Sequence, residues 1–173
     1  MIKLNKIKTN LGITLVEVLV ACSIISVSMF ALMTTAQKGL VLSNQALIKS
    51  QANLLLEEGA EAVKSIRNNN WTTISSLSLN TSYHLYFNTT TKLWVLDTST
   101  TNLSGCIPTY PIDNVFGRTI TIASVGRDAS DKILASGGTV DAGTKKVTVT
   151  VTWKSGTTTN SQSLSFYISN IFN

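Results

Sequence analysis

Residues 11–17, LGITLVE, open the apolar run that decides how this chain is organised. From residue 13 to residue 36 the run is 24 residues long, and its only charged side chain is that of Glu17. As an α-helix it would measure about 36 Å at about 1.5 Å per residue, which exceeds the roughly 30 Å of hydrocarbon in a bilayer. The run therefore predicts a membrane-spanning helix. An ionised carboxylate in such a helix costs on the order of 2.5–3.5 kcal/mol near the bilayer centre, so we expect Glu17 to have a partner.

The segment before the run, residues 1–12, is short and basic, with Lys3, Lys6 and Lys8 and no apolar core of its own. Basic residues that flank an apolar span stay on the cytoplasmic side, so the chain after about residue 37 is expected on the far side. Without these three lysines the formal charge falls from +5 to +2. The basic balance of the chain therefore does not indicate nucleic-acid binding, and no basic patch interleaved with aromatic residues supports it.

Three kinds of processing signal were compared at this end of the chain. A secretory signal with a cleavage site at residues 34–36, TTA, does not fit, because the run is too long and contains Glu17. A lipoprotein signal ending in LVAC, residues 19–22, would leave a mostly apolar segment after Cys22, where a polar tether is expected. The third kind requires a glycine before the apolar run and a glutamate five residues after that glycine, as at Gly12 and Glu17.

Gly12 followed by ITLVE and VLVACSIISVSMFALM resembles the class III signal of type IV prepilins and type II secretion pseudopilins, and TLVEVLVA looks closer to minor pilins and pseudopilins than to a major pilus subunit. The resemblance implies that a prepilin peptidase cuts after Gly12 and that Ile13 becomes the N-methylated first residue. It also implies that Glu17 pairs with the N-terminal amine of a neighbouring subunit. Ile13 replaces the commoner Phe, and Thr34 stands where many pilins have a helix-breaking proline, so helix melting is not expected there.

The helical pattern continues beyond the apolar run, with Leu40, Leu47 and Leu54 at intervals of seven residues. Because no proline interrupts residues 13–67, we expect one helix of that length, ended by the asparagines 68–70 and weakened only by Gly39. We also expect a Glu61–Lys64 ion pair and a packing role for Trp71. The predicted apolar stripe comprises Leu40, Val41, Leu47, Ile48, Leu54, Leu55, Ala62, Val63 and Ile66.

After Trp71 the apolar period changes from 3.6 to 2, which predicts strands. The expected strands are residues 83–87 and 92–96, forming a hairpin, then 118–123, 146–153 and 163–168; residues 97–111 and 126–143 are expected to be loops. An antiparallel sheet with one apolar face needs a cover, and the stripe from Leu40 to Ile66 is the cover available. The prediction is an α+β, pilin-like fold: a leader, 1–12; a transmembrane segment, 13–36; and a head, 37–173.

No residue pattern in the sequence favours catalysis, a metal or a cofactor. His84 lies in a predicted strand without a second histidine or a nearby cysteine, and the two cysteines, Cys22 and Cys106, are far apart in sequence. Asp128, Asp131 and Asp141 could form a calcium loop, but their spacing fits no EF-hand. The chain is therefore not expected to be an enzyme, and no catalytic, cofactor or metal residues are assigned.

The resemblance implies a structural subunit, a minor pilin or pseudopilin, of a type IV pilus or type II secretion-like filament. Its partners would be other subunits, the prepilin peptidase, the inner-membrane assembly platform and the lipid bilayer, with no specific nucleic acid. It would wait as a single-pass inner-membrane protein with a cytoplasmic N-terminus, and then enter a filament in the periplasm or at the cell surface. The alternative is a membrane-anchored binding module, an adhesin or DNA-uptake component, whose β head contacts a ligand through its loops.

Overall fold

The computed structural model describes residues 14–99, 106–107 and 111–171. The chain divides into two units, Met1–Leu47 and Ile48–Asn173, which are described separately. Helix α1 (Leu15–Asn69) is 55 residues long and contributes its first part to one unit and its last part to the other. The predicted helix is therefore confirmed over its described residues, and it ends in the asparagine run as expected.

Asn70 begins a second, five-residue helix, α2 (Trp71–Ser75), that the sequence analysis did not predict. Its backbone is extended, with φ −162° and ψ 115°, and its side chain accepts a hydrogen bond from the Thr72 amide at 2.9 Å. This is the geometry of an N-cap, in which a side-chain oxygen satisfies an amide of the first turn. Trp71 is partly buried and packs against the core, as the sequence predicted.

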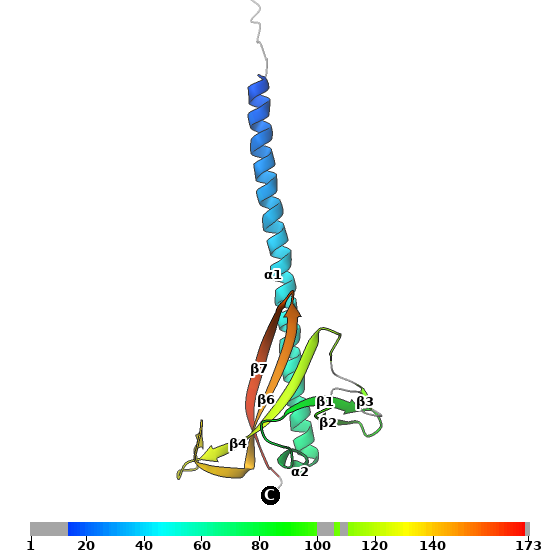
Figure 1. Ribbon diagram of the computed structural model, residues 1–173, viewed down its shortest axis with the longest axis vertical. Helices are drawn as coiled ribbons and strands as arrows, with labels where there is room; N and C mark the ends of the chain where they lie inside the picture. The colour runs from blue at the N-terminus through cyan, green and yellow to red at the C-terminus, as the bar shows by residue number, and fades with distance from the viewer. Residues whose placement is uncertain (1–13, 100–105, 108–110, 172–173) are drawn as a thin grey trace, which may run out of the picture. The chain divides into compact units, whose positions relative to one another are not determined.

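The second unit contains an antiparallel sheet in the order β2-β1-β4-β6-β7, on which the last part of α1 packs (Figure 1). Two further short strands lie off this path, β3 on β1 and β5 on β4. The strands are β1 (Ser82–Asn88), β2 (Leu93–Asp97), β3 (Cys106–Ile107), β4 (Phe116–Arg127), β5 (Ile133–Leu134), β6 (Thr139–Ser155) and β7 (Thr158–Ser169). The α+β arrangement of a long N-terminal apolar helix on an antiparallel sheet is thus confirmed.

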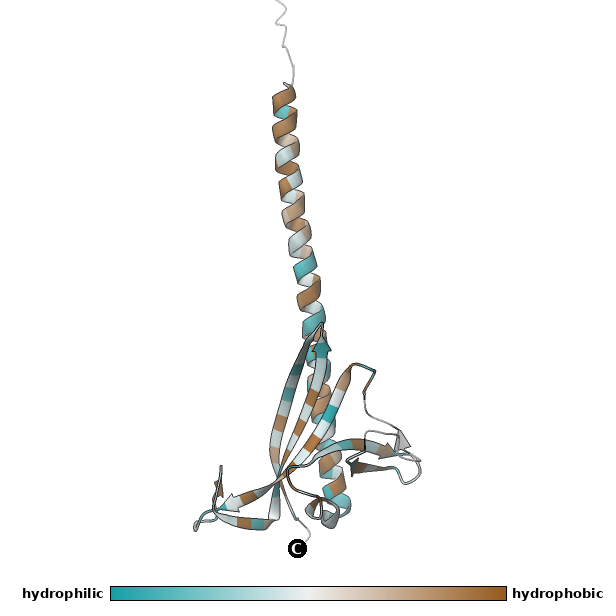
Figure 2. Cartoon of the chain, viewed as in Figure 1, coloured by the Kyte–Doolittle hydropathy of each residue, from teal (hydrophilic) through white to brown (hydrophobic). Residues whose placement is uncertain are grey.

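The hairpin predicted for residues 83–87 and 92–96 is present as β1 and β2, and it turns at Lys92, whose φ is 59°. The strands predicted for 118–123 and 146–153 lie inside the longer β4 and β6. Along β6 the burial alternates, with Val147, Val149 and Val151 buried and the threonines between them partly exposed. Figure 2 shows this alternation as brown bands on the strands of the sheet.

The prediction of a loop over residues 126–143 is wrong in part. β4 continues to Arg127, β5 pairs with it, and β6 begins at Thr139, so these residues form a three-stranded arm. Glycines make this pairing possible, because a Cβ on Gly126 would lie 1.8 Å from the Gly137 carbonyl oxygen. The sequence contains these glycines, but glycine is also a loop residue, and the alternation of apolar and polar residues is lost where β4 bulges at Ser124/Val125.

Helix α1 packs on the sheet through small and medium-sized side chains. At Gly59 the helix lies close to the sheet, since a Cβ there would lie 2.8 Å from Val149 Cγ1 and 3.2 Å from Arg118 Cδ. Opposite the helix, Ile120 and Ile122 of β4 are fully buried, as are the three valines of β6. The buried residues of α1 are Ala52, Leu56, Gly59, Ala60, Ala62, Val63 and Ile66.

The prediction that the stripe covers the sheet from Leu40 onwards is wrong for the heptad leucines and for Val41, which is 57% exposed. Leu40, Leu47 and Leu54 are 73%, 58% and 63% exposed. Leu54 lies two residues from both Ala52 and Leu56, and two residues are about 200° of rotation in a helix with 3.6 residues per turn. Because Ala52 and Leu56 are on the side of the helix that meets the sheet, Leu54 is on the opposite side.

Candidate membrane anchor and assembly helix

The described part of the chain begins at Thr14, so Gly12 and Ile13, the residues of the expected cleavage and methylation site, lie outside the described residues. Glu17 is in the first turn of α1. Its Oε2 accepts a hydrogen bond from the Thr14 amide at 2.9 Å, and its own amide donates to Thr14 Oγ1 at 3.4 Å. This reciprocal pair is a capping box, which satisfies two amides at the start of the helix.

The capping box gives Glu17 a partner that the sequence analysis missed. Its signature, Thr or Ser followed three residues later by Glu, is present as Thr14 and Glu17. The carboxylate also lies where the helix dipole favours negative charge. One role of Glu17 is therefore local: it fixes where α1 begins.

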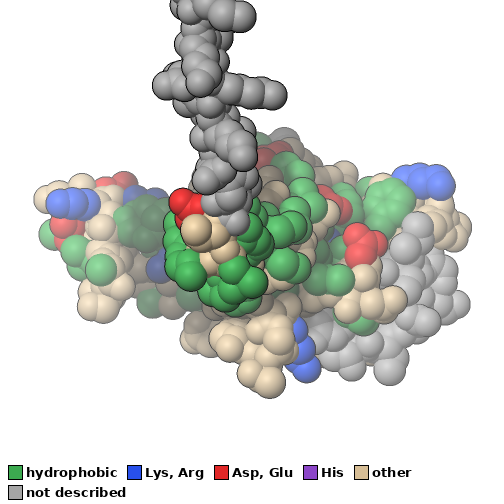
Figure 3. Space-filling view, turned by 90° about the horizontal axis from the view of Figure 1, so that it is seen from above, with side chains coloured by type: hydrophobic (Ala, Val, Ile, Leu, Met, Phe, Trp, Pro, Cys, Tyr) green, Lys and Arg blue, Asp and Glu red, His purple; other side chains and the backbone are tan. Residues whose placement is uncertain are grey.

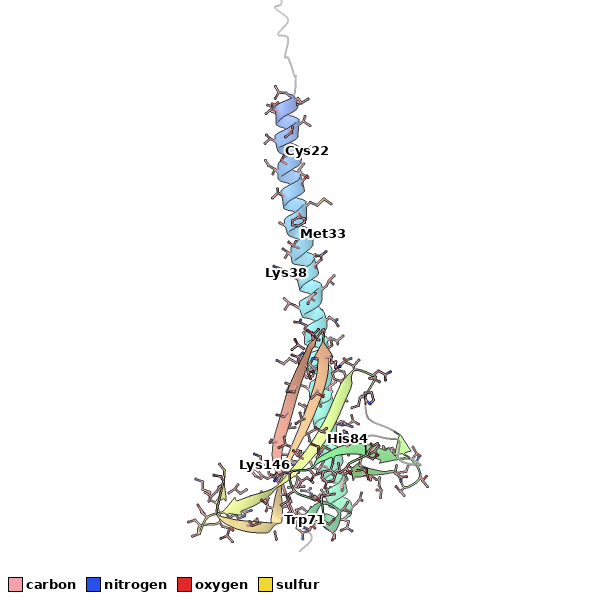
Figure 4. The ribbon with its side chains drawn as sticks, in the orientation of Figure 1. Cys22, Met33, Lys38, Trp71, His84 and Lys146 are labelled. Carbon is pink, nitrogen blue, oxygen red and sulfur yellow. The ribbon has the colours of Figure 1, made fainter. Side chains whose placement is uncertain are left out.

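Among the described residues, one helix, α1, is long and apolar enough to cross a membrane, and none of its most apolar 18-residue window is buried. Figure 4 marks Cys22 and Met33 in this part of α1, with Lys38 just after it. Figure 3, which looks down on the chain from above, shows hydrophobic side chains around most of the visible rim of the helix.

The hydroxyl groups of this apolar segment are satisfied inside the helix. Ser23, Ser26 and Ser28 each donate to the carbonyl four residues earlier, at 2.7, 2.7 and 2.8 Å. Thr34 and Thr35 both donate to the Ala31 carbonyl at 2.9 Å. In hydrocarbon a polar group must find its partner within the protein, so these five hydroxyls are compatible with a membrane environment.

Large apolar side chains also remain exposed after the segment predicted to cross the membrane. Besides the three heptad leucines, Val41 and Leu42 are 57% and 65% exposed. Contiguous exposed apolar residues of this size are unusual on a monomeric soluble protein and mark interaction surfaces. We call Leu40, Leu47 and Leu54 the heptad row.

In the head, a buried guanidinium lies between the helix and the sheet. Arg118 of β4 is 1% exposed, and its Nη1 donates to Glu58 Oε2 at 2.9 Å and to the Leu55 carbonyl at 3.2 Å. Its Nε and Nη2 are buried, and neither has a hydrogen-bond partner among the described residues. Glu58, by contrast, is 45% exposed. The sequence analysis did not predict this pair, whereas the Glu61–Lys64 ion pair that it did predict is present, with Lys64 Nζ 2.7 Å from Glu61 Oε1.

The aspartates of the arm face an arginine. Arg127 Nε lies 2.6 Å from Asp141 Oδ2 and 3.8 Å from Asp131 Oδ1. Hydrogen bonds from Thr144 and Arg127 lower the pKa of Asp141 from 3.8 to about 2. Asp128 instead accepts hydrogen bonds from the amides of Ser130 and Lys132. Within the described ranges no three Asp, Glu, His or Cys residues are placed to hold a metal ion.

Two other residues singled out in the sequence, Cys22 and His84, belong to different units of the chain. His84 is buried in β1, and Cys22 is exposed on α1, while the side chain of Cys106 lies outside the described residues (Figure 4). The head also has an open hollow of about 410 Å³ where β4 begins and β6 ends. Pro111, Asn114, Gly117, Thr152, Lys154 and Thr159 are among its lining residues.

No protein-family profile, curated protein or solved structure matches this chain.

Proposed function

We propose that this chain is a structural subunit, a minor pilin or pseudopilin, of a type IV pilus or type II secretion-like filament. In this proposal the chain is cut after Gly12, N-methylated on Ile13 and assembled through α1. The observation that carries the proposal is the heptad row, which remains exposed beyond the segment needed to cross a membrane. The motif at Gly12 and Glu17 supports it independently.

An anchor alone does not account for the heptad row. A transmembrane helix needs about 20 apolar residues, and residues 15–36 supply them. Leucines spaced by seven residues form the seam along which helices pack against one another. Full burial of one leucine side chain contributes about 1.5–3 kcal/mol, so a bundle of such helices would gain several kcal/mol from the row of each subunit. This favours assembly through α1 over simple anchoring.

Glu17 can serve both the helix and the filament. A carboxylate has two oxygens and about four acceptor positions. In the capping box, Oε2 accepts from the Thr14 amide of the same chain, and the rest of the carboxylate can accept from the Ile13 amine of a neighbouring subunit. Pairing the two charges offsets the desolvation that each would suffer alone in an apolar bundle.

The proposed partners are other filament subunits, the prepilin peptidase, the inner-membrane assembly platform and the lipid bilayer. The subunit would reside in the inner membrane as a single-pass protein with a cytoplasmic N-terminus, consistent with Lys3, Lys6 and Lys8 before the span. It would then enter a filament in the periplasm or at the cell surface. The proposal includes no enzymatic activity, cofactor, metal or specific nucleic acid.

Mass spectrometry of the mature N-terminus tests the processing step. We expect a chain that begins at methylated Ile13, and we expect Gly12→Val to leave the leader uncut. A lipid on Cys22, or a chain that begins at residue 37, would contradict the proposal.

Assembly is tested in cells by the recovery of the subunit in sheared filaments. We expect Leu47→Gln to reduce recovery at least ten-fold, because it places an amide in the seam. Leu42→Gln is the matched control, since Leu42 is similarly exposed but lies outside the heptad row. Glu17→Leu should be cut normally and yet be poorly incorporated. If Glu17→Leu and Leu47→Gln both assemble like the wild type, assembly through α1 is excluded.

The second candidate function, a membrane-anchored binding module, is favoured by the hollow at the end of the sheet. Its lining combines hydroxyls, an amide and the Lys154 ammonium, which are groups that bind polar ligands. Binding of polysaccharides or DNA to the purified chain, lost in Lys154→Ala and Asn114→Ala but retained in Lys132→Ala, would support this function.

A further inference from the structure

Strand β7 forms an open edge of the sheet. The order β2-β1-β4-β6-β7 ends there, and among the described strands β7 pairs only with β6, from Thr144↔Ser169 to Ser155↔Thr158 (Figure 1). Alternate residues of a strand direct their N–H and C=O groups to each side. The 12 residues of β7 therefore offer about six donors and six acceptors on the unpaired side.

This edge lacks the features by which sheets normally avoid pairing with other chains. Such features are charged side chains, prolines, bulges or a very short strand. Residues 155–171 contain no charged residue and no proline, and the pairing of β7 with β6 has no register shift. The opposite edge differs: β2 has only five residues, contains Asp97 and follows Lys92. The β2 edge of this sheet is thus protected against pairing with another chain, and the β7 edge is not.

We propose that β7 is an interaction surface and that it pairs, antiparallel, with β7 of a second copy of this chain. Like charges directly opposite each other destabilise a strand pair. Because β7 carries no charge, pairing with itself brings no such repulsion. A two-fold axis perpendicular to the sheet would join the two sheets into one through main-chain hydrogen bonds.

The two faces of β7 also match when the strand meets its own copy. Opposed residues in an antiparallel pair point to the same face. Serines 161, 163 and 165 are exposed on the outer face and would meet one another. On the helix side, Leu164 is 38% exposed and Phe166 is half-buried beneath the Lys64 ammonium, 5.8 Å from its ring centre. The second copy of β7 would bury the parts of these two apolar side chains that remain exposed at the edge.

This pairing goes beyond the proposed filament function and does not rest on it. The heptad row belongs to α1, whereas the pairing uses the backbone of β7. A chain with Leu40→Gln and Leu47→Gln should therefore still pair through β7.

Disulfide cross-linking of the full chain in detergent micelles tests the pairing and its register. In a chain with Cys22→Ser and Cys106→Ser, we would introduce Ser161→Cys, Ser163→Cys or Ser165→Cys and oxidise each variant alone and in mixed pairs. Opposed Cα atoms are about 4.5–5.5 Å apart in an antiparallel pair, within the range of about 4.4–6.8 Å that a disulfide spans. We expect efficient cross-links only between positions whose residue numbers add up to one constant, because a single register fixes that sum.

A charge at the edge provides the second arm of the test. Ser163→Lys places two ammonium groups near each other in the self-pair, and we expect at least a ten-fold loss of cross-linking. Thr150→Lys is the matched control: it lies opposite Ser163 on the same face but on β6, away from the edge. The proposal is overturned if no β7 dimer forms, if cross-linking ignores register, if Thr150→Lys has the same effect, or if these cysteines capture a different protein in place of a second copy.

Discussion

Removing Glu58 should destabilise the head far more than its position on an exposed helix turn indicates. Its carboxylate is the one acidic partner recorded for the buried Arg118 guanidinium within the described part of the chain. A hydrogen bond to a charged group contributes about 1.5–3 kcal/mol, and breaking a fully buried ion pair costs about 3–5 kcal/mol. Because Glu58 is 45% exposed, water replaces part of the lost interaction. We therefore expect Glu58→Ala to lower the free energy of unfolding by about 1.5–3 kcal/mol.

The same reasoning predicts that Arg118→Met has only a small effect on the free energy of unfolding. This substitution removes a buried charge together with two buried donors, Nε and Nη2, that have no partner. An unsatisfied buried polar group costs about 1–3 kcal/mol, so its removal offsets the lost bonds to Glu58 and Leu55. In the Arg118→Met background, Glu58→Ala should change the free energy of unfolding by less than about 0.5 kcal/mol. The two substitutions should thus be coupled by at least about 1 kcal/mol.

Urea unfolding of a fragment of residues 37–173, which includes the entire buried cluster, measures these effects. A loss of about 2 kcal/mol corresponds to a midpoint shift of roughly 1 M in urea. Glu61→Ala is the control, because Glu61 also forms an ion pair, with Lys64 of the same helix, but its side chain is 71% exposed. Exposed pairs of this kind contribute about 0–1 kcal/mol. If Glu58→Ala is no more destabilising than Glu61→Ala, or if the effects of Glu58→Ala and Arg118→Met simply add, the reasoning from burial is refuted.

Two further predictions concern the contact of α1 with the sheet and the arm. Gly59→Ala should destabilise the fragment, because its Cβ would lie 2.8 Å from Val149 Cγ1, and overpacking costs about 1–3 kcal/mol, partly offset by about 1 kcal/mol of helix propensity. Gly39→Ala gains the same helix propensity without a clash, since nothing outside its own stretch of helix lies within 4 Å of its Cβ, so it should not lower the urea midpoint. The pKa of Asp141 is lowered from 3.8 to about 2, so its contribution to stability is present above about pH 3.8 and is lost as the pH falls towards 2. Asp141→Asn should flatten the pH dependence of hydrogen exchange in the arm over that range, and an unchanged profile would contradict the ion pair with Arg127.

The long helix and most strands could be predicted from the sequence, because each depends on a local period. The absence of proline over residues 13–67 allowed one helix, and strict alternation marked β6. The arm was missed because β4 bulges at Ser124/Val125, where alternation fails. Glycines 126, 137 and 138 allow close backbone pairing there, and glycine is equally common in loops.

At the candidate site, interactions between residues that are close in sequence could be predicted from the sequence. Interactions between residues that are far apart in sequence could not. The capping box is a four-residue pattern, so Thr14 and Glu17 could have been paired without a structure. The Arg118–Glu58 pair joins residues 60 positions apart, and no local pattern links them. Its existence depends on how α1 lies over β4, which in turn depends on the absence of a side chain at Gly59.

The second half of α1 has two apolar faces, and they differ in the size of their side chains. The face on the sheet includes Ala52, Gly59 and Ala62, and these small residues allow close packing on β4 and β6. The other face carries the larger leucines of the heptad row, which are exposed. A helix that is apolar on more than one side is normally buried on more than one side. The sheet is one cover, and the proposed assembly of α1 with other helices would supply the second.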